Sequence, residues 1–143
     1  MRNQKAIYRL AIDSMMAALY FVLAYFSFSF GNVRITLASL AIVLVSFLYS
    51  VPDALLVSVI GELIHQCAKY GFAPTTALWI LPVFFRALLL SLSASFSRRK
   101  GQHLENRTFL YYSVCLFSSL IVTMVNTGIL FLDGFLMNYP VSF

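Results

Sequence analysis

Long apolar runs separated by short polar breaks constrain this chain more than any other feature of its sequence. The breaks fall where turn-forming or basic residues cluster, at 31–32, 50–53, 71–74 and 98–107. They leave five apolar runs, at 10–30, 35–50, 54–70, 75–97 and 108–132. A membrane-spanning helix needs about 20 apolar residues, and only 10% of this chain is charged, against about 25% in globular proteins. We therefore expect an all-α integral membrane helical bundle with about five transmembrane helices, forming a single transmembrane domain over 1–143.

Two clusters of basic residues predict the orientation of the bundle, because short loops rich in Lys and Arg stay in the cytoplasm. The clusters are Arg2, Lys5 and Arg9, then Arg98, Arg99, Lys100 and Arg107. Four crossings between them place both on the same side, so we expect a cytoplasmic N-terminus. The short second and third runs then cross by bending or by local thinning of the membrane. The loops around Arg34 and around 72–75 face outward, and the net charge of +5 needs no nucleic acid to explain it.

The third run has one polar side. Its polar residues recur at three- and four-residue intervals, which is the spacing of one helix face: Ser58, Glu62, His65, Gln66 and Lys69. Polar groups on a membrane helix are costly against lipid and usually face the interior of a bundle or a water-filled cavity. The stripe therefore predicts a pocket or pathway enclosed by protein.

The fourth run repeats this pattern with Thr75, Trp79, Pro82 and Arg86. Glu62 and Arg86 each lie about ten residues inside their run, which puts both near the middle of the membrane at about 1.5 Å of rise per residue. An unpaired charge at that depth costs about 2.5 to 3.5 kcal/mol. We predict that the two side chains approach each other, either as a structural ion pair that keeps two helices in register or as part of a ligand site.

The fifth run adds Asn126 and Asp133 near its outer end, so three polar stripes face a common interior. A mixture of aromatic and charged side chains suits a small molecule with a flat ring and one or more anionic groups. The candidate substrate-binding residues are Arg34, Glu62, His65, Gln66, Lys69, Trp79, Arg86 and Asn126. His65 is either a ligand contact or a hydrogen-bonded packing residue, and one histidine with one glutamate is too little for a metal site.

The first run carries small residues on one face. Ser14 and Ala18 stand four residues apart, the small-xxx-small spacing that lets membrane helices approach closely, and Ala17 lies beside them. This face either docks a partner helix or packs within the bundle. Asp13, near the inner edge, is expected to reach the membrane surface or to pair with Arg9.

Several of these segments resemble the substrate-binding (S) components of energy-coupling factor (ECF) transporters, which import vitamins. They are R-I-T-L-A-S-L at 34–40, the turn at 51–54, G-E-L-I-H-Q at 61–66 and the polar-faced run from Tyr70 to Arg86. The resemblance implies a six-helix bundle that binds its vitamin from the outside. It also implies that the loops at 31–36, at 70–76 and beyond Asp133 cover the pocket.

The resemblance also implies partner proteins. The small-residue face of the first helix would meet a transmembrane coupling protein through Ser14, Ala17 and Ala18. Two cytoplasmic ATPase subunits would hydrolyse ATP, and this chain itself would bind no cofactor.

Ten residues follow Asp133, too few for a sixth helix. We therefore expect an external C-terminus and a chain that lacks the last helix of the family fold, as a truncated product would. The alternative to transport is a small membrane subunit or assembly factor whose polar interior only holds helices together. An enzyme ranks last, because the sequence has no Ser/His/Asp, paired-carboxylate or phosphate-loop arrangement.

Overall fold

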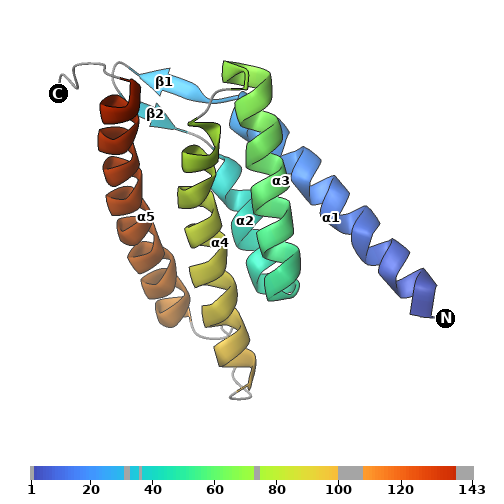
Figure 1. Cartoon of the computed structure of the whole chain (residues 1–143). Coiled ribbons are helices and arrows are strands. Elements are labelled where there is room, and N and C mark those ends of the chain that lie inside the picture. Colours follow the sequence, from blue (N-terminus) through green and yellow to red (C-terminus); the bar gives the residue numbers. More distant parts are fainter. Residues whose placement is uncertain (1, 31–32, 36, 73–74, 100–107, 138–143) are drawn as a thin grey trace.

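The computed structural model of the chain describes residues 2–30, 33–35, 37–72, 75–99 and 108–137. Over these residues it forms five helices and a two-stranded ribbon (Figure 1): α1 (Arg2–Tyr25), β1 (Phe28–Phe30), β2 (Val33–Ile35), α2 (Ala38–Leu48), α3 (Val51–Tyr70), α4 (Thr76–Arg99) and α5 (Thr108–Met137). The expected helical membrane bundle is confirmed, and the ribbon is an addition to it.

The two ends of the bundle differ in what they carry. The ribbon, the end of α3 and the end of α5 lie together at one end, called the ribbon end below (Figure 1). The start of α1, the α2–α3 turn and the end of α4 lie toward the opposite end, called the arginine end because Arg9, Arg98 and Arg99 belong to these segments.

Four helices, α1, α3, α4 and α5, are long and apolar enough to cross a membrane. The helix expected over 35–50 is shorter than predicted, because Ile35 belongs to a strand and α2 begins at Ala38. Its 11 residues rise about 16 Å at about 1.5 Å each, roughly half of the 30 Å hydrocarbon core. The described part of the chain therefore has four full-length spans, and the second of the five predicted crossings is the short α2, which starts partway across the bundle.

The ribbon explains why the first helix ends at Tyr25 and not near residue 30, as its run of apolar residues predicted. Phe-Ser-Phe and Val-Arg-Ile alternate on either side of two residues, the pattern of a tight β-hairpin. In the structure the strands are antiparallel, with Phe28 opposite Ile35 and Phe30 opposite Val33.

The ends of α3 have local causes. Ser50 and Asp53 form a capping box at its start, so the helix begins three residues earlier than the predicted 54. Gly71 ends it with a φ of +78°, a left-handed value that glycine adopts without steric cost.

Small side chains fill the contacts between helices. α2 packs against α1, α3 and α4, while the described part of α5 packs its backbone closely only on α4. The side chains with almost no exposed surface include Ala41, Ala54, Ala87, Ser46, Ser58 and Ser91. Small residues let membrane helices approach closely.

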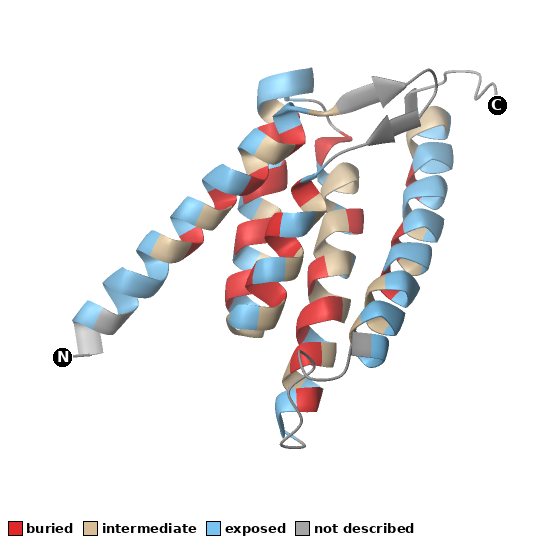
Figure 2. Ribbon diagram, turned by 180° about the vertical axis from the view of Figure 1, so that it is seen from behind, coloured by how far each residue is buried: buried red, intermediate tan, exposed pale blue. Residues whose placement is uncertain are grey.

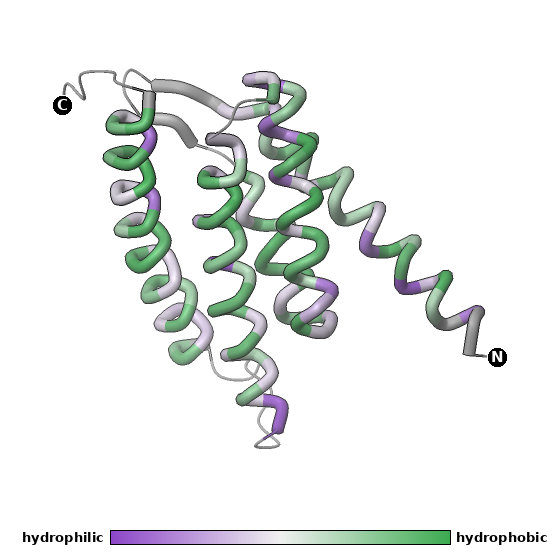
Figure 3. Tube along the Cα trace, in the orientation of Figure 1, coloured by the Kyte–Doolittle hydropathy of each residue, from purple (hydrophilic) through white to green (hydrophobic). Residues whose placement is uncertain are grey.

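Large apolar side chains face outward, the reverse of a water-soluble protein. Figure 2 shows that most of α5 is exposed, and Figure 3 shows that the helix is largely hydrophobic along the same stretch. Phe117 and Leu120, for example, are more than half exposed. Such a surface is compatible with lipid and costly in water.

Candidate ligand-binding pocket

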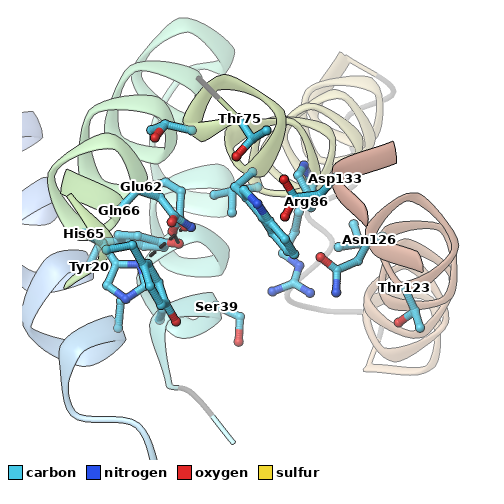
Figure 4. A pocket seen from close by; sticks show the side chains of 18 residues that line it. Tyr20, Ser39, Glu62, His65, Gln66, Thr75, Arg86, Thr123, Asn126 and Asp133 are labelled. Carbon is cyan, nitrogen blue, oxygen red and sulfur yellow. Dashed lines mark hydrogen bonds and ion pairs between the residues drawn. The ribbon is translucent and has the colours of Figure 1, made fainter. Parts of the chain in front are cut away.

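A cavity of about 680 Å³ lies between α1, α3, α4 and α5, with the first residues of α2 in its wall. Its polar lining comes from every long helix (Figure 4). The lining side chains are Tyr20, Ala24, Ala38, Ser39, Glu62, His65, Gln66, Tyr70, Thr75, Thr76, Trp79, Pro82, Val83, Arg86, Val122, Thr123, Asn126 and Asp133. The predicted enclosed pocket is therefore present.

Glu62 is the centre of a hydrogen-bonded group on one wall. Tyr20 donates its hydroxyl to Glu62 Oε2 at 2.5 Å, and Gln66 donates Nε2 to Glu62 Oε1 at 2.6 Å. His65 Nδ1 lies 3.3 Å from the same Oε1. All four side chains are more than nine-tenths buried. The carboxylate is thus satisfied within α1 and α3, which removes the cost of burying it alone.

Tyr20 is a site residue that the sequence prediction missed. Ala17, Tyr20 and Ala24 are all buried and follow the spacing of one helix face. Tyr20 is the polar member of that face, and this was the signal available. The ring fits because the facing residue is Gly61, where an added Cβ would lie 2.6 Å from Tyr20 Cδ1.

Arg86 lies on the other side of the cavity, together with Asn126 and Asp133 (Figure 4). Glu62 and Arg86 form no ion pair with each other in the described residues, so the structural ion pair considered above is absent, although both side chains line the same cavity. The physical reason is that Glu62 already receives hydrogen bonds from Tyr20 and Gln66. Glu62 and Arg86 therefore lie on opposite sides of one cavity.

The other predicted residues divide into three groups. His65, Gln66, Trp79 and Asn126 line the cavity as predicted. Lys69 does not line it. It is exposed in the last turn of α3, and its Nζ lies 5.9 Å from the ring centre of Tyr70. Arg34 lies in β2 opposite Ser29, and its side chain is outside the described residues.

The start of α2 brings backbone groups to the cavity. Ala38 and Ser39 line it, and Leu37, which precedes them, provides no side-chain cap. The first N–H groups of a helix lack partners within the helix and carry the positive end of its dipole. The N–H of Leu40 donates to the backbone oxygen of Leu37 at 3.0 Å, and those of Ala38 and Ser39 belong to residues that line the cavity.

The small-residue face of α1 is split between the interior and the surface. Ala17 is 4% exposed and packs with Val45, Ala54 and Val57. It is therefore buried in the bundle and unavailable as the predicted partner contact. Ser14 and Ala18 remain exposed.

Asp13 is buried, and Arg9, its predicted partner, forms an ion pair with Asp53 instead. Arg9 Nη2 donates to Asp53 Oδ2 at 2.9 Å and to Ser50 Oγ at 2.9 Å. The capping box holds Asp53 at the start of α3, within hydrogen-bond distance of Arg9.

Apolar helices around a cavity with polar lining residues are typical of membrane proteins that bind small polar ligands. Residues 8–143 match the family described as ECF transporter, substrate-specific component. The chain belongs to this family and is a substrate-specific subunit of a transporter, as the sequence resemblance predicted. No curated protein and no solved structure matches it significantly.

Proposed function

We propose that the chain captures a vitamin or related micronutrient from outside the cell and delivers it to an ECF module, which consists of a membrane coupling protein and two cytoplasmic ATPases. The observation that carries this proposal is the cavity in which polar side chains from α1, α3, α4 and α5 converge inside an apolar surface. Neither a structural ion pair nor helix packing requires an open volume of about 680 Å³.

The orientation follows from charge. Arg9, Arg98 and Arg99 lie at the arginine end, and basic residues near membrane helices favour the cytoplasm. The N-terminus is then cytoplasmic and the ribbon end external. Tyr70 and Thr75, which flank the α3–α4 connection at the ribbon end, line the cavity, so a ligand would enter it from outside.

The wall formed by α3 selects ligand groups that donate hydrogen bonds. Glu62 as a carboxylate only accepts, so Gln66 must turn its NH₂ group toward it and keeps its carbonyl oxygen as an acceptor. His65 meets Glu62 through Nδ1, and its buried Nε2 has no partner among the described residues. In the neutral tautomer that donates from Nδ1, Nε2 is an acceptor. Two acceptors on one wall fit a ligand edge with N–H or O–H groups.

The opposite wall offers donors, but the charge balance limits how acidic the ligand is. Arg86 and the first N–H groups of α2 suit a carbonyl or a single anionic group. Among the described residues, the lining contains one basic side chain that is always charged, Arg86, and two acidic side chains, Glu62 and Asp133. Lys69 does not line the cavity. The sequence alone slightly favoured an anionic ligand. The structure favours a neutral or cationic nitrogen heterocycle whose flat ring packs against Trp79 or Tyr70.

Delivery requires a docking surface on the outside of the bundle. Ser14 and Ala18 are exposed on α1, four residues apart, and present little side-chain bulk to an approaching helix. We assign the contact with the membrane coupling protein to these two residues and exclude Ala17, which is buried.

Equilibrium binding of radiolabelled vitamins to the purified protein tests the proposal. We expect saturable binding of thiamine or riboflavin, and weaker binding of biotin, pantothenate and folate, which all carry a carboxylate. Glu62→Gln and Arg86→Gln should each lower the affinity for the bound vitamin by about tenfold or more, the usual effect of losing a charged hydrogen bond. Lys69→Gln, outside the cavity, is the control and should bind like the unmodified protein.

Two results would reject this assignment. One is the absence of saturable binding across the panel. The other is a folded Glu62→Gln/Arg86→Gln double variant with unchanged affinity, which would reduce both residues to a structural role.

A further inference from the structure

A second hollow, of about 480 Å³, lies at the arginine end, away from the ligand cavity. It is formed where the α2–α3 turn meets α1 and the last turn of α4. The side chains that matter are Arg9, Ser50, Ser95, Arg98 and Arg99, with Leu48 at the edge. Nothing in the proposed transport cycle uses this hollow.

The hollow is positively charged. Three guanidinium groups line the hollow, those of Arg9, Arg98 and Arg99. The charge of Arg9 is offset by its ion pair with Asp53. Arg98 Nη2 donates to the backbone oxygen of Tyr49 at 2.8 Å, a neutral partner that leaves the charge in place. Arg99 makes no hydrogen bond or ion pair with the described residues, and no described acidic side chain lines the hollow. Two exposed guanidinium groups are therefore available to an anion.

The surroundings of the hollow are apolar on the side that faces away from the bundle. Leu48 is 57% exposed and Phe96, next to Ser95, is 62% exposed. Arg98 and Arg99 are also the last residues of a membrane-spanning helix, where lipid head groups meet acyl chains. Guanidinium groups beside exposed apolar side chains match a molecule that has a phosphate and hydrocarbon chains in one structure.

We propose that this hollow binds the head group of an anionic phospholipid. The lipid phosphate accepts hydrogen bonds from Arg98 and Arg99, the Ser95 hydroxyl lies within the same hollow, and Leu48 and Phe96 contact the acyl chains. Basic pockets between membrane helices bind acidic head groups in this way. The bound lipid would tie α1, the α2–α3 turn and the end of α4 to the membrane surface.

Native mass spectrometry of the purified protein, mixed with phosphatidylglycerol or with phosphatidylcholine of the same acyl chains, tests this proposal. We expect phosphatidylglycerol to be retained more strongly. Arg99→Gln should lower its affinity about fivefold, the effect of one basic residue near an acidic membrane surface. Arg99 is chosen because its removal breaks no described bond. Arg99→Lys should retain most of the affinity, and Lys69→Gln, which removes one positive charge at the ribbon end, should change little.

Several outcomes would overturn the proposal. Equal losses in Arg99→Gln and Lys69→Gln would show a general charge effect, and no loss in Arg99→Gln would show that the hollow is not the site. Full displacement of the lipid by millimolar inorganic phosphate would identify a phosphate site without lipid selectivity. If Arg99→Gln left lipid binding unchanged but abolished the complex with the ECF module, the hollow would be a contact site for that module. The melting temperature of each variant in phosphatidylcholine controls for misfolding.

Discussion

At the scale of single residues, the pocket depends on one glycine. Gly61 faces α1 and leaves room for the ring of Tyr20 beside α3, and the hydroxyl of that ring donates to Glu62. Without that hydroxyl, the buried carboxylate would keep only the hydrogen bonds from its own helix. The position of Glu62, and through it the orientation of Gln66 and His65, follows from the missing side chain at residue 61.

Gly61→Ala should therefore destabilise the protein and weaken ligand binding. The added methyl group would come within 2.6 Å of Tyr20 Cδ1, and overpacking of this kind costs about 1 to 3 kcal/mol. The matched control is Gly128→Ala in α5, where an added Cβ meets nothing within 4 Å. There the higher helix propensity of alanine should be neutral or stabilising by up to about 1 kcal/mol. Thermal unfolding in detergent measures both, and equal effects would show that Tyr20 is not held by Gly61.

At the scale of elements, the length of α2 decides where the cavity is. An 11-residue helix fills only about half of the membrane thickness. The space beyond its first residues, Ala38 and Ser39, is left to side chains from the four long helices and becomes the cavity. A second helix that began at residue 35, as the sequence predicted, would extend into this volume.

The start of α3 depends on its capping box. Ser50 donates its backbone N–H and its hydroxyl to Asp53 Oδ2, at 3.2 and 2.6 Å. Ser50→Ala should lower the free energy of unfolding by about 1 kcal/mol, the usual cost of losing an N-terminal cap. Ser113→Ala in α5 is the control, because that hydroxyl only bonds the backbone oxygen of Phe109 in its own helix. Similar losses in both variants, measured by chemical unfolding, would contradict a role for the cap.

At the scale of the whole molecule, the arrangement separates two environments. The ribbon end is beside the ligand cavity, and the arginine end carries the exposed guanidinium groups of Arg9, Arg98 and Arg99. Between them, large apolar side chains cover the outside, as Figure 2 shows for α5. A bundle of this kind faces water only at its ends, so the two ends meet different surroundings.

The orientation can be measured with an impermeant maleimide on intact cells. In a background with Cys67→Ala and Cys115→Ala, Phe72→Cys should react from outside, because residue 72 is exposed at the ribbon end. Arg99→Cys, at the arginine end, should react only after the cells are permeabilised. The opposite labelling pattern would reverse the orientation and place the ligand cavity on the cytoplasmic side.

The sequence by itself determined the membrane class, the long helices and the polar stripe of α3, because hydrophobicity and helical period are local properties. It also contained the signal for the ribbon, in the alternation around 31–32, but the apolar character of the first run concealed it. It correctly placed Glu62, His65, Gln66, Trp79, Arg86 and Asn126 in the lining of one cavity.

Only the tertiary structure decided which groups meet. Tyr20 reaches Glu62 across 42 positions of the chain, so its role depends on how α1 packs on α3. The same packing buries Ala17, leaves Ser14 and Ala18 outside, and separates Arg86 from Glu62 by a cavity. Lys69 shares the polar stripe in the sequence, but its side chain lies outside the cavity, near the ring of Tyr70. Helical spacing limits the face on which a residue lies, whereas its partners depend on the neighbouring helices.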